Sequence, residues 1–292
     1  MNSHLTSLIQ PSYSLFDESF SQQFLGGSHL LFFLGTTSLE YAILDPATNR
    51  FIALEQFTLP TYTNETERFE QLSHIFQQCE TLQKDFKKIS LAFAERRSTL
   101  VPAALYDKQA LSQYLAFNHT MDANDVAGVD YLPNANVYNA YVEAPLVTQF
   151  FRKQFPKIQV LHHASVLLES LVIRHKHSTQ QQVFAHFEQG QFDLVVMAGK
   201  QLVLHNSFAF ETKEDVVYYI LFVCEQLELS PEKINLHLSG EIPAESETTN
   251  LLRQYIGQLT LESRPANFSY SGTLQSAPAH RFFHLFNQAL CA

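Results

Sequence analysis

Histidines are the side chains of this sequence that could most readily bind a metal ion, because the 292-residue chain contains 13 of them. His162 and His163 are adjacent, so on a strand they would point to opposite faces. His186, His205 and His237 fall in three segments with strand-like patterns and could meet in the folded chain. No cysteine or carboxylate accompanies them at the spacing of a zinc site. We therefore predict that the chain has no metal site.

Other motifs for catalysis or anion binding are weak. The sequence contains no G-x-S-x-G nucleophile, no P-loop and no Rossmann glycine fingerprint. Basic residues cluster at Lys84–Lys88 and Arg174–His177, each near the expected end of a helix, where cations interact favourably with the helix dipole. Arg96 and Arg97 could meet an anion, but a solvated pair after a strand is the more common arrangement. These patterns assign no catalytic residue.

Charge and cysteine usage restrict the class of partner and the compartment. The formal net charge of -10 argues against broad binding to nucleic acid or anionic membranes, which requires a surplus of Lys and Arg. Cys79, Cys224 and Cys291 are widely spaced and form no C-x-x-C motif, as is typical of a reducing compartment. The sequence shows no signal peptide and no apolar run of about 18 residues that would span a membrane. We expect a cytoplasmic protein with no nucleic-acid partner and no membrane insertion.

The first half contains a recognisable series of strands and one helix. Three short strands, Leu30–Leu34, Leu39–Leu44 and Phe51–Phe57, are joined by links too short for parallel pairing, so they predict an antiparallel meander. Asn64 is a favourable N-cap for the helix that follows, with Glu67 in the capping-box position. Lys88–Ala94 predicts the fourth strand.

The same order returns about 150 residues later. Val183–Phe187, Phe192–Met197 and Leu202–Phe208 predict three strands. A helix capped by Thr212 with Asp215 follows, and its Val216–Cys224 run is expected to be buried on most sides. Ile234–Gly240 predicts the fourth strand. The repeat indicates a duplicated α/β domain.

Further α/β elements complete each half. The segment 101–130 has no counterpart in the second half and is interpreted as an insertion. We predict two domains, residues 1–180 with that insertion and residues 181–292. The remaining expected elements are a strand at Asn134–Val142, a helix at Pro145–Phe155, a strand at Ile158–His162, a helix at Ala164–His175, a helix at Glu247–Tyr255, a strand at Gln258–Glu262, a loop at Ser263–Pro278 and a helix at Arg281–Leu290.

The duplicated β-β-β-α-β-α plan resembles the actin-like ATPase fold, which consists of two ribonuclease-H-like halves around a cleft. More closely, the chain resembles an uncharacterised bacterial family, domain of unknown function 3822. The residues that carry this likeness include the segments "LAFNHT" (Leu115–Thr120), "FPKIQVLHHASVLLESL" (Phe155–Leu171), "GQFDLVVMAGKQLVLHNSFAFETKEDVVYYILFVCEQL" (Gly190–Leu227) and "LHLSGEI" (Leu236–Ile242).

The resemblance implies where a nucleotide would bind, because actin-like ATPases hold phosphates with an Asp-x-Gly hairpin in each half. In the first hairpin Gly35, Thr36 and Thr37 are compatible with phosphate, but apolar residues occupy the acidic positions. In the second, alignment on Asp193 places His186 at the metal-organising position. A shifted register instead gives Glu188 and Gly190, an E-x-G followed by Gln191. Neither hairpin has the expected acid.

The position where the resemblance implies an adenosine cradle reads Ser239, Gly240 and Glu241, with one glycine of the usual pair. A strand-end turn explains the same residues equally well. We therefore expect a non-catalytic actin-like protein, a pseudo-ATPase that acts as a scaffold or regulator and needs no cofactor. The alternatives are a divergent ATPase or phosphotransferase that uses Glu188 with ATP and Mg²⁺ in the cleft, and a sensor that binds a nucleotide without turnover.

A non-catalytic protein needs another way to act, and we expect a protein partner or self-association. Tyr106, Tyr114 and Phe117 lie in the insertion in a mixed polar setting, and aromatic residues are favoured at interface cores. Packing of a small helix through Leu111, Tyr114, Leu115 and Phe117 explains the same pattern.

Overall fold

The computed structural model describes residues 9–18, 20–60, 62 and 64–291. These residues form two compact units. Unit 1 comprises described residues of the segments 1–93, 144–160 and 266–276. Unit 2 comprises described residues of 94–143, 161–265 and 277–292. The fold is α/β, as the sequence predicts, and the domain boundary between residues 180 and 181 stays a prediction.

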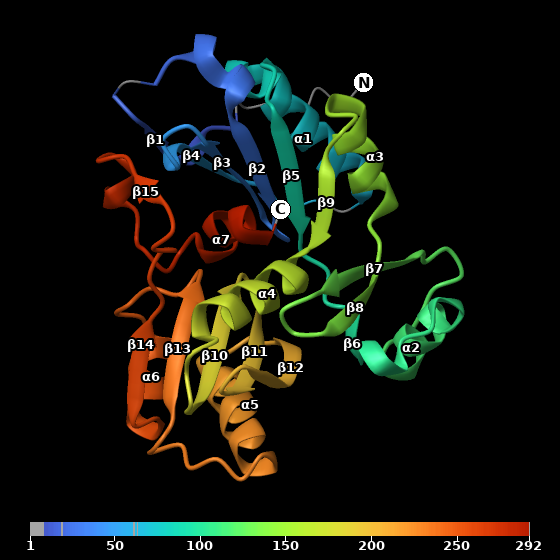
Figure 1. The fold of residues 1–292 in the computed structure, drawn as a ribbon, viewed down its shortest axis with the longest axis vertical. Helices are drawn as coiled ribbons and strands as arrows, with labels where there is room; N and C mark the ends of the chain where they lie inside the picture. The colour runs from blue at the N-terminus through green and yellow to red at the C-terminus, as the bar shows by residue number, and fades with distance from the viewer. Residues whose placement is uncertain (1–8, 19, 61, 63, 292) are drawn as a thin grey trace. The chain divides into compact units, whose positions relative to one another are not determined.

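Unit 1 is built on one mixed sheet (Figure 1). Its strand order is β1-β4-β3-β2-β5-β9, and a short strand β15 pairs with β4. β2 and β3 are antiparallel, and β2 and β5 are parallel, because α1 provides the crossover. The bounds are β1 Pro11–Phe16, β2 His29–Leu34, β3 Ser38–Asp45, β4 Arg50–Thr58, β5 Lys88–Phe93, β9 Gln159–His162 and β15 Ser269–Tyr270, with helices α1 Glu65–Gln78 and α3 Pro145–Gln154 and the short 3-10 turns Gln22–Gly27, Glu80–Gln83 and Leu274–Ser276.

Phenylalanine fills the core of unit 1. Every residue of β2 is buried, and Phe32 at its centre lies against Phe76 of α1, Phe151 of α3 and Phe155. The α1 N-terminus is fixed as predicted, since the Asn64 side chain accepts a hydrogen bond from the Glu67 backbone N–H at 3.1 Å. Local capping and an aromatic core thus hold α1 against β2.

A second sheet organises unit 2, with strand order β12-β11-β10-β13-β14. β10 is antiparallel to β11 and parallel to β13, so its arrangement matches that of β2, β3 and β5 in unit 1. The bounds are β10 Gln181–Glu188, β11 Gln191–Ala198, β12 Gln201–Ala209, β13 Asn235–Gly240 and β14 Gln258–Leu261, with helices α4 His163–His175, α5 Lys213–Gln226, α6 Glu247–Tyr255 and α7 Phe283–Cys291.

The α5 helix confirms one prediction and corrects another. The predicted capping box is present, with the Asp215 N–H donating to Thr212 and the Asp215 carboxylate accepting from the Thr212 N–H. The expectation that Val216–Cys224 is buried on most sides holds for Val216, Val217, Ile220, Val223 and Cys224, but one stripe of the helix departs from it. Tyr218 is 62% exposed and Phe222 is 43% exposed, because both fall on the helix face opposite Val216, Val217 and Ile220. An apolar run can therefore include an exposed aromatic stripe.

Unit 2 also contains a separate three-stranded antiparallel sheet with order β6-β8-β7. Its elements are β6 Ser98–Pro102, 3-10 turns at Ala103–Leu105 and Lys108–Ala110, α2 Leu111–Asn118, β7 Ala127–Leu132 and β8 Val137–Val142. The strand expected at 134–142 is β8, and it pairs in this sheet. The sheet thus extends on both sides of the segment 101–130. Leu115 of α2 is buried against Ala140 and Val142 of β8.

Three further features concern the chain as described. β1, which pairs antiparallel with β4, has no predicted counterpart. Within the described residues, no helix combines the length and the apolar character needed to cross a bilayer. All three cysteines, Cys79, Cys224 and Cys291, are free thiols.

Candidate functional site

The second hairpin, between β10 and β11, carries the candidate residues Glu188, Gly190 and Gln191. Glu188 and Gln191 pair across the turn. Gly190 has φ +74° and no atom near the position of a Cβ, so glycine is favoured here by backbone conformation and not by a close neighbour. The Gly190 carbonyl accepts a hydrogen bond from the Phe210 N–H at 3.0 Å.

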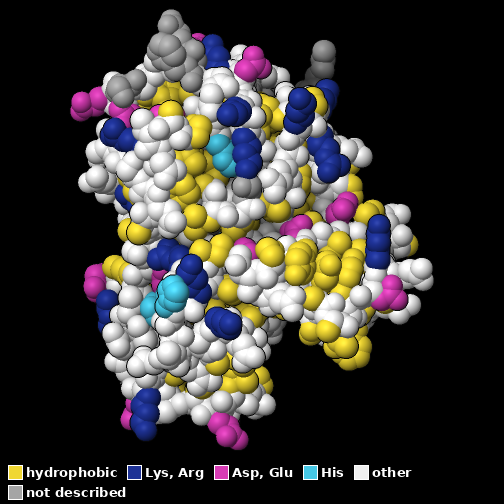
Figure 2. Space-filling view, in the orientation of Figure 1, with side chains coloured by type: hydrophobic (Ala, Val, Ile, Leu, Met, Phe, Trp, Pro, Cys, Tyr) yellow, Lys and Arg dark blue, Asp and Glu magenta, His cyan; other side chains and the backbone are white. Residues whose placement is uncertain are grey.

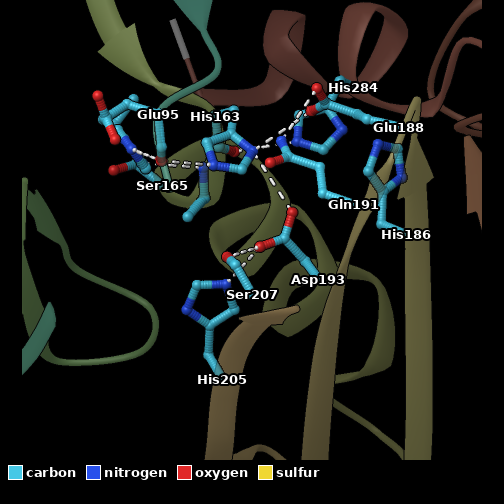
Figure 3. Close-up of polar contacts among 12 residues, drawn as sticks. Glu95, His163, Ser165, His186, Glu188, Gln191, Asp193, His205, Ser207 and His284 are labelled. Atoms are coloured by element: carbon cyan, nitrogen blue, oxygen red, sulfur yellow. Dashed lines mark hydrogen bonds and ion pairs between the residues drawn. The ribbon is translucent and has the colours of Figure 1, made fainter. Parts of the chain in front are cut away.

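The polar side chains of this hairpin lie inside unit 2. Glu188 and Gln191 are both buried, and the Gln191 side-chain amide donates to Glu188 at 3.4 Å. The other Glu188 oxygen lies 3.6 Å from Nδ1 of His163 (Figure 3). One Glu188 oxygen thus accepts a weak hydrogen bond from Gln191, and the contact of the other with His163 is longer than a hydrogen bond.

Asp193, two residues further along β11, shares the same histidine. His163 Nδ1 is 3.4 Å from Asp193 Oδ2, and His205 Nε2 is 3.0 Å from Oδ1, which also accepts from the Ser207 hydroxyl. Burial alone would raise the pKa of Asp193, but these three neighbours together hold it well below its usual value. Asp193 is therefore a carboxylate in the folded protein.

His163 begins α4 and His162 ends β9, so the two side chains do not project from opposite faces of a strand. That expectation is wrong, because the chain turns from strand to helix between them. The Nε2 atoms of both rings approach the Glu95 carbonyl, at 2.7 Å from His162 and 3.1 Å from His163. His162 also caps α4 through a hydrogen bond from the Ala164 N–H.

Two more buried histidines extend the group. His186 Nδ1 is 2.8 Å from the Ser239 hydroxyl, and His284 Nε2 is 3.1 Å from the His163 carbonyl. The ring centres of His186 and His284 lie 3.9 Å apart. Burial lowers the pKa of His186 to about 3 and holds the pKa of His284 well below its usual value. Both rings are neutral near pH 7.

His186, His205 and His237, which could have met in the folded chain, do not form one group. His186 bonds Ser239 and His205 bonds Asp193, whereas His237 bonds Glu262 at 2.8 Å. Throughout the described part of the chain, no three His, Cys, Asp or Glu side chains are arranged to hold a metal ion. We use the name His163 cluster for the buried and half-buried residues Glu95, His162, His163, His186, Glu188, Asp193, His205, Ser207 and His284.

The predicted adenosine cradle, Ser239 to Glu241, is occupied by internal contacts. Gly240 has φ +83°, and a Cβ there would lie 2.1 Å from the Phe187 carbonyl oxygen. The Gly240 N–H donates to His280 O at 2.8 Å, and the Glu241 N–H donates to Phe187 O at 2.7 Å. Glu241 also forms an ion pair with Arg281 at 3.3 Å. Glycine is thus required by close packing of β13 on β10.

The first hairpin, between β2 and β3, lies in unit 1. The Gly35 N–H donates to Ser38 O at 3.0 Å, and the Gly35 carbonyl accepts from the Arg68 guanidinium at 3.0 Å. The Thr37 carbonyl accepts from the Leu59 N–H at 2.8 Å. Thr36 is half-buried. The hairpin is closed by its own backbone and by α1, and ligand binding at these residues stays a prediction.

The His163 cluster contains residues that the sequence did not single out. Glu95 and Ser207 lie far from His163 in the chain, and no local spacing connects them to it. The one available signal was the His162-His163 pair directly before a long apolar helical pattern. The arrangement places the two buried carboxylates, Glu188 and Asp193, beside the His163 imidazole, and the Glu95 carboxylate instead pairs with Arg97.

Comparison with known proteins yields a family and a fold. The family model described as "Protein of unknown function (DUF3822)" matches residues 17–259. A crystal structure from Bacteroides thetaiotaomicron VPI-5482, of a protein with an actin-like ATPase fold and unknown function, is similar with a TM-score of 0.76 and 22% identity. That likeness covers 83% of this chain and 93% of the other.

A second solved structure, the PilM-PilN type IV pilus biogenesis complex, is similar with a TM-score of 0.58 and 11% identity. The likeness covers 90% of this chain and 96% of that one. No curated protein matches the chain. At these identities the likenesses establish the actin-like ATPase fold alone.

Proposed function

The chain belongs to the DUF3822 family, whose function is unknown, and we propose that it is a non-catalytic actin-like protein that acts as a scaffold or regulatory partner. The observation that carries this proposal is the burial of the two carboxylates of the second hairpin region. Glu188 and Asp193 both face His163 inside unit 2. Mg²⁺ requires oxygen ligands that it can reach, and both carboxylates are buried, with Asp193 Oδ1 already accepting hydrogen bonds from His205 and Ser207.

Backbone donors support the same proposal. A phosphate-binding turn presents N–H groups that have no partner within the protein. The N–H groups of Gly35, Gly240 and Glu241 instead donate to the carbonyls of Ser38, His280 and Phe187. A nucleotide would have to break these bonds before it could accept from them.

Measurement of phosphate release from ATP, with and without Mg²⁺, tests the absence of catalysis. We expect no Mg²⁺-dependent release above background in wild type, and none in Glu188→Gln. Turnover in wild type that is lost in Glu188→Gln but kept in the surface variant Glu225→Gln would overturn the proposal. It would favour a divergent ATPase that uses Glu188.

A partner surface is available on the three-stranded sheet. Phe117 of α2 is 89% exposed, and Leu105 is 70% exposed. Tyr131 is also exposed, and on the face drawn in Figure 2 hydrophobic side chains gather over β7 and β8. Apolar groups collected on a small surface favour a protein partner. The PilM-PilN structure, a complex of a protein with this fold, supports the same kind of role.

The structure changes which aromatic residues could contact that partner. Tyr106 stacks on Tyr138 with ring centres 3.7 Å apart, and the Tyr114 hydroxyl donates to Leu105 O at 2.9 Å. Both tyrosines are half-buried, as expected if α2 packs on the unit. Phe117, which the packing interpretation placed in that interface, points to solvent.

Co-purification from the native host tests the partner role. We expect Leu105→Ser/Phe117→Ser to lose a protein that wild type retains, with unchanged circular dichroism and melting temperature. Leu146→Ser/Tyr255→Ser removes two exposed apolar residues on other helices, 52% and 48% exposed, and should retain it. Identical retained proteins for all three would rule out this surface.

A further inference from the structure

A pocket in unit 1 combines positive charge with an apolar floor. Its volume is about 690 Å³, and it lies between the segment that leads into β5 and the segment that leads into β9. Both segments belong to the same compact unit. A pocket of this size falls in the range that binds small molecules, roughly 300–1,000 Å³.

Four lysines line this pocket, Lys84, Lys87 and Lys88 from one segment and Lys157 from the other. All four are exposed, and none forms a salt bridge within the described residues. Asp85 is the one acidic side chain in the lining. Figure 2 shows Lys and Arg side chains on this face of unit 1, over the region where β5 and β9 begin. In a chain of net charge -10, this is a local excess of positive charge.

The floor of the pocket is rigid and apolar. Phe76, Leu82 and Phe155 line it and are buried, and Phe76 and Phe155 belong to the aromatic core around Phe32. Phe86 is half-buried at the pocket wall. A fixed apolar surface below several ammonium groups suits a ligand that has an apolar body and a charged end.

We propose that this pocket binds a small organic phosphate, with two or more phosphate charges placed among the lysines and an aromatic or aliphatic group on the phenylalanine floor. Lysine binds phosphate as a point charge, and three lysines within five residues match closely spaced negative charges better than the spread carboxylates of a peptide. The pocket is too small for a folded partner, which contacts about 20–30 residues on each side. The site lies outside the two hairpins and does not require turnover.

Isothermal titration of the full chain with pyrophosphate and with ATP, without Mg²⁺, tests the proposal. We expect both probes to bind, ATP more tightly because its base can reach the floor, and both more weakly at high salt. Lys84→Glu/Lys87→Glu/Lys157→Glu should weaken both by at least tenfold. Phe86→Ala should weaken ATP binding and leave pyrophosphate binding unchanged.

A charge-matched control separates this pocket from a general effect of net charge. Lys176→Glu/Lys200→Glu/Lys233→Glu changes three exposed lysines of unit 2 and should bind both probes as wild type does. The proposal is overturned if wild type binds neither probe, if both triple variants lose affinity equally, or if hexaglutamate binds the wild type more tightly than the phosphates do. Binding without hydrolysis would leave the proposed non-catalytic role intact.

Discussion

The two large sheets share one strand order but enclose different polar groups. The sheet of unit 1 has the order β4-β3-β2-β5-β9 and carries Glu55 on β4. Glu55 accepts hydrogen bonds from the hydroxyls of Tyr41 and Ser14. The sheet of unit 2 has the order β12-β11-β10-β13-β14 and carries Asp193 on β11. Asp193 contacts the imidazoles of His163 and His205 and the Ser207 hydroxyl. One strand order is therefore compatible with quite different buried polar groups.

The ends of the fourth strands differ as well. β5 ends at Phe93 and continues into Ala94 without a glycine, whereas β13 ends at Gly240 in the left-handed region. The difference follows from packing, because the carbonyl of Phe187 on β10 occupies the space that a Cβ at residue 240 would fill. One sheet thus depends on a glycine at this point and the other does not.

The largest difference that we expect between the units is in acid, which should destabilise unit 2 more than unit 1. The folded pKa of His186 is lowered from 6.5 to about 3, so stability is complete above pH 6.5 and is lost as pH falls toward 3. At pH 5 this one group costs about 2 kcal/mol. Burial lowers the pKa of His162 and His284 in the same direction, whereas unit 1 has His29, lowered to about 4.

Hydrogen exchange by peptide at pH 7 and pH 5, corrected for intrinsic rates, measures that difference. We expect β10, β11 and β13 to lose more protection at pH 5 than β2, β3 and β5. His186→Gln should reduce the acid-induced loss, and His177→Gln, on the surface, should not. Equal losses in the two sheets would contradict the comparison.

Gly240→Ala tests the packing difference between the fourth strands. The left-handed backbone costs about 1–2 kcal/mol for alanine, and displacement of the Phe187 carbonyl adds about 1–3 kcal/mol. We expect a total loss of about 3 kcal/mol in the free energy of unfolding by urea. Gly190→Ala has a similar φ but open space, so it should lose only about 1–2 kcal/mol. Equal losses would mean that the close contact of residue 240 with the Phe187 carbonyl on β10 adds nothing to the cost of an alanine there.

The smallest expected effect compares the two buried carboxylates. Asp193→Asn removes a charge that His163 and His205 stabilise, and we expect a loss of about 2–3 kcal/mol at pH 7. Glu55→Gln removes a charge bonded to neutral hydroxyls and should cost about 1 kcal/mol. Urea unfolding of both variants gives the two values. A larger loss for Glu55→Gln than for Asp193→Asn would contradict the view that imidazoles stabilise Asp193 more than hydroxyls stabilise Glu55.

Elements with local signals could be predicted from the sequence. The Asn64 cap and the Thr212–Asp215 capping box depend on residues three apart, and both are present. The two antiparallel meanders were predicted from their short links and strand-like runs, and both large sheets contain the predicted meander. The turn predicted at Gly190 is present, and Gly240, for which a strand-end turn was one of two open explanations, also has a positive φ.

Features that depend on distant pairing could not be predicted. β1 has a short, weakly alternating sequence and forms a strand only because it pairs with β4, about 40 residues later. Glu95 meets His162 and His163 across 67 and 68 residues, with no pattern that links them. No buried residue of α2 lies on the same helix face as Phe117. The helical period of the sequence does not show this, because an exposed docking residue and a core residue can follow the same period.

The three free thiols have a consequence for chemical labelling. Burial raises the pKa of Cys79 and Cys224, and burial together with Glu169 raises that of Cys291 to about 12. Since the thiolate is the nucleophile, all three should react slowly with maleimides near neutral pH. A cysteine introduced at the exposed position 113, one helical turn from Phe117 on α2, would then take up a fluorophore selectively, without removal of the native ones. A single dye placed there would report directly on whatever docks against the three-stranded sheet.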